Sequence, residues 1–188
     1  MALLRACLIA GLLIGFGVRA AATAAGSSVP DSERDVKAAF LYNFAKFVEW
    51  PPETFSDASS PLVLCVLGDE PLSASLQTTV KGETVDSRRF QVRQLRDPVG
   101  ARACHVLFIG PAEKGRVPDL LAALRGTGVL TVGGGADFLD RGGMIRLFLE
   151  KNRVRFDINL EAAERSHLKL SSKLLRLARA VNPQRREG

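Results

Sequence analysis

The 188-residue chain has few of the side chains on which most enzymes and metal sites depend. It contains two histidines and three cysteines, and no pair of them has the spacing of zinc ligands. The nucleophile elbow of serine hydrolases and the Walker phosphate-binding sequence are also absent. We therefore predict a protein that is not an enzyme and holds no metal or cofactor.

One adjacent pair, Cys104 and His105, looks at first like a nucleophile and its base. Both residues lie in an apolar run that we interpret as a strand, where neighbouring side chains point to opposite faces of the sheet. The adjacency therefore argues against a catalytic pair, and a buried, hydrogen-bonded His105 is the favoured interpretation. A small hydrolase that uses these two residues is the weakest of our three functional hypotheses.

Aromatic residues that recognise nucleic acid are scarce as well, with one Trp and one Tyr in the chain. Nucleic-acid binding is excluded because no recognised binding motif is present. The formal net charge is +6, and its distribution is uneven: residues 141–188 contain twelve Lys and Arg against five Asp and Glu. This basic region is either a solvated face or a surface for an acidic partner or an anionic membrane.

No apolar run is long enough to anchor the chain permanently in a membrane. The longest N-terminal run, residues 6–18, falls short of the roughly 20 residues that a membrane-spanning helix needs. Arg5 precedes this run and small residues follow it, which is the pattern of a secretory signal peptide. We predict that residues 1–25 are a signal peptide, cleaved after Ala22 or within the next three residues. Residues 26–34 are then a flexible leader, and residues 183–188 are a basic tail.

Two cysteines remain after removal of the predicted signal peptide, Cys65 and Cys104. Both lie in apolar runs that we interpret as strands, and adjacent strands bring Cα atoms within the reach of a disulfide. An exported protein occupies a compartment in which disulfides persist. A disulfide and two buried thiols are both consistent with the sequence.

Apolar spacing predicts a single α/β domain over residues 35–182, with a mostly parallel sheet, helices on both faces and a C-terminal antiparallel hairpin. The predicted helices are 35–49, 71–79, 113–125, 161–165 and 172–181. The predicted strands are 62–67, 90–95, 104–109, 129–132, 144–150 and 153–160. The last helix begins after Ser171 as its N-cap and would bury Leu174, Leu177, Ala178 and Val181.

A glycine run, residues 133–135, follows one of the predicted strands and precedes Asp137. Glycines allow backbone amides to approach an anion closely, so the run is a candidate binding loop. A flexible loop is the favoured interpretation, because the run matches no specific phosphate-binding pattern. The loop nevertheless supports our second hypothesis, a small-molecule binding protein with a pocket at the glycine run.

A partner-binding surface is the main functional prediction from the residues themselves. In the last strand Val154, Phe156 and Ile158 alternate with polar side chains, so one face is core and the other meets water or a partner. Aromatic and arginine side chains often anchor protein interfaces. The candidate partner-binding residues are Tyr42, Trp50, Arg153, Arg155, Asp157 and Asn159.

Several ordered segments are distinctive: KAAFLYNFAKFVEWP at 37–51, LCVLGD at 64–69, CHVLFI at 104–109, GGMI at 142–145, and NRVRFDIN at 152–159 followed by LKLSSKLL at 168–175. Together they resemble the YfiR-like family of periplasmic regulators. Each segment is weakly specific, but their order and spacing cover essentially the whole predicted domain. Some relatives carry a second cysteine pair late in the chain, whereas here no cysteine follows Cys104.

The resemblance implies a regulator in the periplasm that binds the periplasmic part of an inner-membrane diguanylate cyclase and holds it inactive. Envelope signals would relieve the inhibition, in the best-known arrangement through capture by an outer-membrane OmpA-like lipoprotein. Release would raise cyclic di-GMP and promote biofilm. Some relatives serve a membrane sensor kinase instead. A homodimer is left open by the sequence.

Overall fold

The structure is a computed structural model and describes residues 31–182. The predicted signal peptide, the first part of the predicted leader and the basic tail lie outside these residues. Residues 31–34, assigned to the leader by sequence, are the start of the first helix.

The described residues form five α-helices, three short 3-10 helices and ten strands. In chain order they are α1 Asp31–Lys46, β1 Val48–Glu49, η1 Pro52–Thr54, β2 Leu62–Leu67, α2 Glu70–Thr79, β3 Thr84–Val85, β4 Arg88–Leu95, η2 Pro98–Ala103, β5 Val106–Ile109, η3 Pro111–Glu113, α3 Val117–Ala123, β6 Leu130–Gly133, β7 Ile145–Glu150, β8 Arg153–Ile158, α4 Leu160–Arg165, β9 Lys169–Leu170, α5 Ser172–Leu177 and β10 Ala180–Val181.

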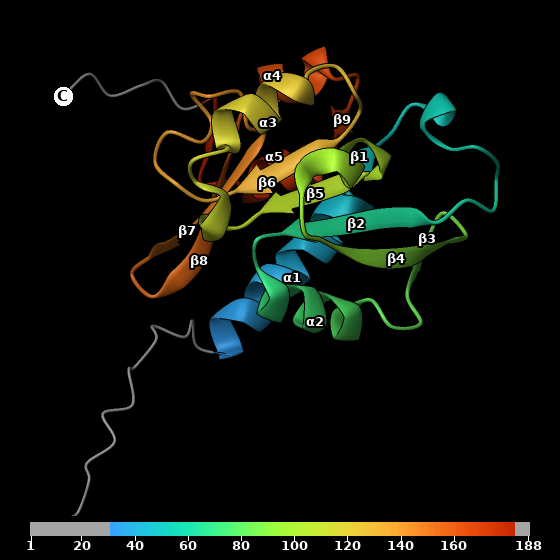
Figure 1. The fold of residues 1–188 in the computed structure, drawn as a ribbon, viewed down its shortest axis with the longest axis horizontal. Helices are drawn as coiled ribbons and strands as arrows, with labels where there is room; N and C mark the ends of the chain where they lie inside the picture. The colour runs from blue at the N-terminus through green and yellow to red at the C-terminus, as the bar shows by residue number, and fades with distance from the viewer. Residues whose placement is uncertain (1–30, 183–188) are drawn as a thin grey trace, which may run out of the picture.

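Eight strands form one sheet in the order β10-β8-β7-β6-β5-β2-β4-β3 (Figure 1). The pairs from β4 through β2, β5 and β6 to β7 are parallel, and β7 and β8 form an antiparallel hairpin. A separate two-stranded sheet pairs β1 with β9. The predicted fold class, a mostly parallel sheet with helices on both faces and a C-terminal hairpin, is confirmed.

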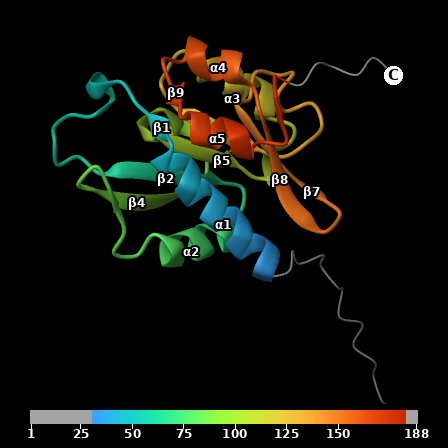
Figure 2. The same ribbon diagram turned by 180° about the vertical axis from the view of Figure 1, so that it is seen from behind.

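Strand β2 shows why a continuous apolar run forms the centre of this sheet. Its alternate residues Leu62, Leu64 and Val66 join the core under α1, α2 and α5, which Figure 2 shows on the near face. The intervening residues Val63, Cys65 and Leu67 join a second core under α3 on the opposite face. All six side chains are buried. A strand buried on both faces has no polar positions, as the sequence indicated.

Cys65 and Cys104 are joined by a disulfide, with their Cα atoms 5.9 Å apart. Cys104 lies two residues before β5, and β5 pairs with β2, which contains Cys65. The bond lies in the core on the α3 face. It therefore joins two neighbouring central strands and closes a sequence separation of 39 residues.

Three of the five predicted helices differ from the observed ones by more than one residue at an end. The first ends at Lys46 rather than residue 49, because Val48 pairs with Leu170 in the small sheet. The predicted helix 113–125 contributes only α3, which begins at Val117 with a proline in its first turn, where the missing N–H costs nothing.

The largest correction concerns the predicted final helix, residues 172–181. Ser171 caps it as predicted, accepting a hydrogen bond from the Leu174 N–H, but α5 ends at Leu177 and the chain continues as β10. Leu174 is buried, whereas Leu177 is 60% exposed and Val181 38% exposed. The backbone leaves the helix because it pairs with the edge of β8 instead, which satisfies that strand's outward-facing groups.

Candidate partner-binding surface

The β7–β8 hairpin presents a polar face opposite the core. Lys151 and Asn152 form its two-residue turn with φ values of 49° and 60°, which is the backbone of a type I′ turn. Cross-strand pairs on this face join Arg146 to Asp157, Phe148 to Arg155 and Glu150 to Arg153. We call these six side chains the hairpin face.

Asp157 was predicted to face water or a partner, and this prediction is wrong, because its side chain is fully buried. Its carboxylate accepts hydrogen bonds from Arg146 Nη2 at 2.6 Å and from Arg179 Nε and Nη2 at 2.8 and 2.6 Å. Burial alone would raise the pKa of Asp157, but the hydrogen bonds from Arg179 and Arg146 outweigh it and hold the pKa below its ordinary value. Asp157 is therefore a structural anion.

The same two arginines bracket the ring of Phe148. The guanidinium carbon of Arg146 lies 4.7 Å from the ring centroid and that of Arg179 lies 4.8 Å from it. Cations at this distance from a ring are attracted to its π face. Phe148 is consequently a half-buried aromatic held by charged neighbours at the centre of the hairpin face.

Arg153 and Arg155 are exposed, as predicted, and no described residue forms a side-chain hydrogen bond or ion pair with either. They project from the end of β8 nearest the hairpin turn. At the same edge of the sheet, α5 and β10 expose Leu177 and Val181. Val181 pairs with Ile158, so its side chain lies on the opposite face of the sheet, and the hairpin face itself combines free cations with a fixed aromatic ring.

Tyr42 and Trp50 lie away from the hairpin face and are half-buried. The Tyr42 hydroxyl donates to Glu83 Oε2 at 2.6 Å, and its ring packs against Phe90 at the other end of the sheet. Trp50 Nε1 donates to the Gly128 carbonyl at 3.0 Å. The structure thus does not bring these two predicted residues together with the arginines.

Asn159, the last predicted partner-binding residue, is used within the fold. Its Oδ1 accepts from the Ala162 N–H at 3.0 Å and caps α4, while its Nδ2 donates to the Leu139 carbonyl at 3.1 Å. The sequence argument also missed Arg146, Phe148 and Arg179. The first two have a signal in the sequence, because Arg146 and Phe148 alternate with Ile145 and Leu147 along β7 and so share the opposite face of the strand.

Gly133, in the predicted glycine run, and Gly143 further along the chain both pack against an aromatic ring. Phe138 is buried, and its ring lies where a Cβ atom at Gly133 or Gly143 would stand. The interpretation of residues 133–135 as a flexible loop therefore needs correction at Gly133, which is part of β6. The absence of side chains at Gly133 and Gly143 makes room for one aromatic ring.

His105 is buried and hydrogen-bonded, as predicted, with 7% of its surface exposed. Its Nδ1 accepts from the Val63 N–H at 3.0 Å, and its ring stacks on Phe55 with centroids 4.5 Å apart. Burial, helped by the nearby charges of Arg88 and Arg93, lowers the pKa of His105 to about 4. Cys104 is in the disulfide, so it offers no thiol for a hydrolase.

Among residues 31–182, no three His, Cys, Asp or Glu side chains gather in an arrangement that could hold a metal ion. No helix of that region has both the length and the apolar composition required to cross a membrane.

The sequence matches the family model described as YfiR/HmsC-like over residues 34–179. The chain belongs to the YfiR/HmsC-like family. Members of this family are periplasmic regulators of cyclic di-GMP signalling, and the family is regulatory rather than catalytic.

One solved structure shares the fold of this YfiR/HmsC-like chain. A conserved domain protein from Vibrio cholerae O1 biovar El Tor superposes with a TM-score of 0.52 at 10% identity, covering 79% of this chain and 60% of that chain. The chain thus spans less than two thirds of that protein. The ABC domain from Streptococcus pneumonia in complex with L-Trp has a TM-score of 0.43 at 8% identity, covering 63% of this chain and 54% of that chain. The first likeness concerns the fold alone, and the second carries no argument.

Proposed function

We propose that this chain is a periplasmic adapter that binds and represses an inner-membrane signalling protein, first among the candidates a diguanylate cyclase. The family assignment and the signal-peptide pattern of residues 1–25 support the compartment and the pathway. The proposal is carried by the hairpin face, where exposed Arg153 and Arg155 flank the fixed ring of Phe148.

The physical argument rests on preorganisation. The ion pairs of Asp157 immobilise Arg146 and Arg179, and these two arginines hold Phe148. A partner that docks on the hairpin face therefore orders few side chains on this chain, which lowers the entropic cost of binding. The unpaired cations beside the ring favour a partner with an acidic surface, because complementary charge steers encounter and sets specificity.

The experiment compares repression in cells that lack this protein and carry it back on a plasmid. We expect deletion to raise cyclic di-GMP severalfold and the unaltered protein to restore the low level. The double variant Arg153→Glu/Arg155→Glu should leave cyclic di-GMP at the level of the deletion strain while keeping its thermal midpoint. The matched control Lys114→Glu/Lys169→Glu changes the same charge at exposed positions elsewhere and should repress normally.

The partner is identified by a photo-crosslinking residue placed at Arg155. A captured diguanylate cyclase supports the proposal as stated, and a captured sensor kinase keeps the adapter but changes its pathway. Capture of an OmpA-like lipoprotein at the same position would mean that the lipoprotein relieves repression by competing with the membrane protein for the hairpin face. Full repression by the Arg153→Glu/Arg155→Glu variant would contradict the proposed surface.

A second candidate function, small-molecule binding, is favoured by one cavity. It has a volume of about 340 Å³ and lies between α3, β6 and α4, where it is lined by Gly142 and by no residue of the predicted glycine run 133–135. Buried Thr131 and Met144 line it together with Arg125 and Arg165. A metabolite that raises the thermal midpoint of the chain, and not that of Arg125→Ala, would support this function, because selective binding stabilises the folded state. No shift across a metabolite library would count against it.

A further inference from the structure

The sheet has an open edge at the end opposite the hairpin face. Strand β4 pairs with β2 from Phe90 to Leu95, while on its other side β3 pairs only with Arg88 and Arg89. Among residues 31–182, no other strand and no further backbone hydrogen bond covers residues 90–95 on that side. We call this stretch the β4 edge.

The register of the β3–β4 hairpin tells which backbone groups point outward. Asp86 and Ser87 form a two-residue turn with φ values of 49° and 65°, so the flanking pair Val85 and Arg88 is hydrogen-bonded. Because the direction alternates along a strand, the N–H and C=O groups of Phe90, Val92 and Gln94 then face outward. The β4 edge thus offers a ladder to which another strand can pair.

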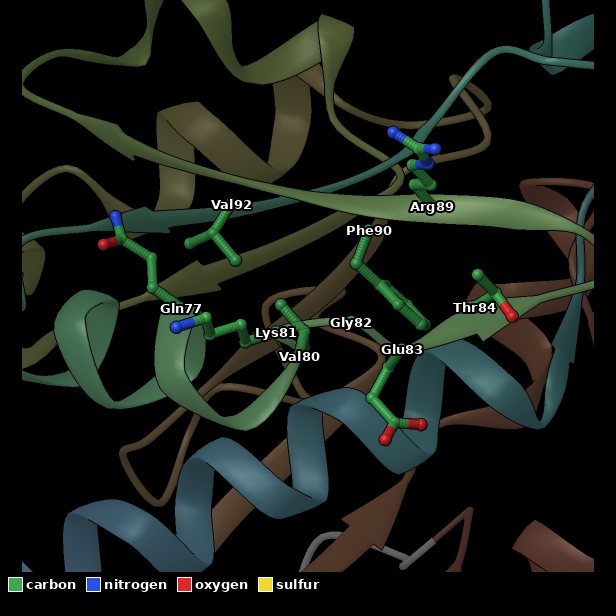
Figure 3. Close-up of a pocket in the computed structure, with 9 residues that line it drawn as sticks. All are labelled: Gln77, Val80, Lys81, Gly82, Glu83, Thr84, Arg89, Phe90 and Val92. Atoms are coloured by element: carbon green, nitrogen blue, oxygen red, sulfur yellow. The ribbon is translucent and has the colours of Figure 1, made fainter.

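A cavity of about 310 Å³ lies directly beside the β4 edge. Figure 3 shows Phe90 and Val92 pointing into it from β4 toward α2 and α1, while Arg89 points to the other side of the strand. Val80 completes its apolar part, and Lys81 and Glu83 line its border. The contact of Phe90 with Tyr42 and the hydrogen bond from Tyr42 to Glu83 fix this wall. The cavity has the position needed to receive one side chain from an added strand.

The charge of the β4 edge determines which kind of strand can pair with it. Residues 88–96 contain four arginines and no acidic residue. Arg88 is used within the fold, since it donates to the carbonyls of Asp57 and Ser60, whereas Arg89, Arg93 and Arg96 are exposed. Like charges opposite each other on paired strands are destabilising, so a second copy of this edge is disfavoured and an acidic strand is favoured.

We propose that the β4 edge binds an extended, acidic segment of a partner protein by strand addition, with one apolar side chain of that segment in the cavity beside Phe90 and Val92. Main-chain hydrogen bonds supply affinity in this mode and side-chain pockets supply specificity. The site lies at the opposite end of the sheet from the hairpin face. The chain can therefore hold two partners at once, which goes beyond repression of one membrane protein.

The test uses the ¹⁵N-labelled protein and a seven-residue peptide that alternates Glu with Leu and Val. We expect the peptide to shift the amide signals of Phe90, Val92 and Gln94 and to slow their hydrogen exchange. The same peptide with Lys in place of Glu should bind at least tenfold more weakly. Methylation of alternate peptide nitrogens should have a similar effect, because it removes the donors of the added strand.

Two variants locate the site. Gln94→Pro removes an outward N–H from an edge strand without removing a donor to β2, so the fold tolerates it and peptide affinity falls at least tenfold. Arg93→Glu reverses a charge and leaves the backbone donors in place, so it tests the site even if the proline variant fails to fold. It should weaken peptide binding at least fivefold. Lys169→Glu is the matched control and should bind normally.

Three outcomes would overturn the proposal. One is the absence of amide shifts at a peptide concentration of about 1 mM, at which even a complex with a dissociation constant of about 1 mM would be detected. Another is equal binding of the acidic peptide to the unaltered chain and to Gln94→Pro or Arg93→Glu. The third is conversion of a dimer into a monomer by Gln94→Pro, which would assign the β4 edge to a second copy of the chain.

Discussion

Arginines have two different roles in the eight-stranded sheet, and the comparison of Arg146 and Arg179 at one end with Arg89 and Arg96 at the other shows both. At the β8–β10 end, Arg146 and Arg179 are bound to the buried carboxylate of Asp157. At the β4 end, Arg89 and Arg96 are exposed and no buried carboxylate pairs with them. The residue type is the same, but one set of charges stabilises the fold and the other remains available to a partner. Local charge density in the sequence therefore does not reveal which arginines can bind.

The largest expected effect comes from removing the disulfide that joins β2, the neighbour of β4, to the segment that leads into β5. The variant Cys65→Ala/Cys104→Ala should lose about 4 kcal/mol of unfolding free energy, because the bond closes a separation of 39 residues and restricts the unfolded chain. Urea unfolding measures the loss. Hydrogen exchange should accelerate more in β4 than in β7, since β4 pairs with the strand that carries Cys65. A loss below about 1 kcal/mol would contradict this account.

At the β8–β10 end, Asp157→Ala should lower the unfolding free energy by about 3 kcal/mol. The substitution leaves the partly buried Arg146 without its anion. Chemical unfolding at neutral pH measures this loss. The amide signal of Arg179 should also shift, since β10 loses the side-chain bond that supports its pairing with β8. Unchanged stability would show that Asp157 is not the anchor of this end.

His105 makes the stability of the chain depend on pH, and Arg88 and Arg93 of the β4 end help to lower its pKa. Its pKa is about 4 in the folded chain, against 6.5 as the ordinary value. Between these values the unfolded chain binds a proton that the folded chain does not, so stability falls as pH decreases and is level again below the folded pKa. We expect a loss of about 2 kcal/mol from about pH 7 to about pH 5.

The measurement is urea unfolding across that range, with His105→Gln as the control. Asp57, Asp137 and Asp157 have pKa values lowered below 3.8, so their contributions are retained until the pH is more acidic. An equal loss in His105→Gln would assign the pH dependence to another group.

The smallest effect is expected for an exposed ion pair. Asp137 and Arg141 are bonded at 2.6 Å on the surface, where water screens their attraction. Asp137→Ala should leave the midpoint of urea unfolding unchanged within experimental error. The same unfolding experiment as for Asp157→Ala tests it, and a comparable loss in both variants would remove the distinction between buried and exposed pairs.

Periodicity in the sequence was enough for the central fold. It predicted β2 with its observed bounds, the hairpin turn at Lys151 and Asn152, and Ser171 as the cap of the last helix. These features depend on neighbours within a few residues, or on burial so complete that only apolar residues fit.

The candidate site was predicted less well, because its contacts join distant segments. The anion Asp157 is bound by Arg179, which lies 22 residues further along the chain, beyond the point where α5 ends. Tyr42 is bound by Glu83 at a separation of 41 residues, and Trp50 by Gly128 at a separation of 78. Alternation identifies which face a residue occupies, but only the tertiary fold decides whether another segment covers it.

The ring of Phe138 between Gly133 and Gly143 has a consequence for how relatives of this chain diverge. Because any side chain at either glycine would overlap the ring, the three positions can change only together. An alignment of relatives should therefore show Gly133 and Gly143 constant wherever residue 138 is aromatic, and substituted where it is small. Conservation of these glycines among relatives would then reflect a packing constraint. It would not be evidence that the glycines bind a ligand.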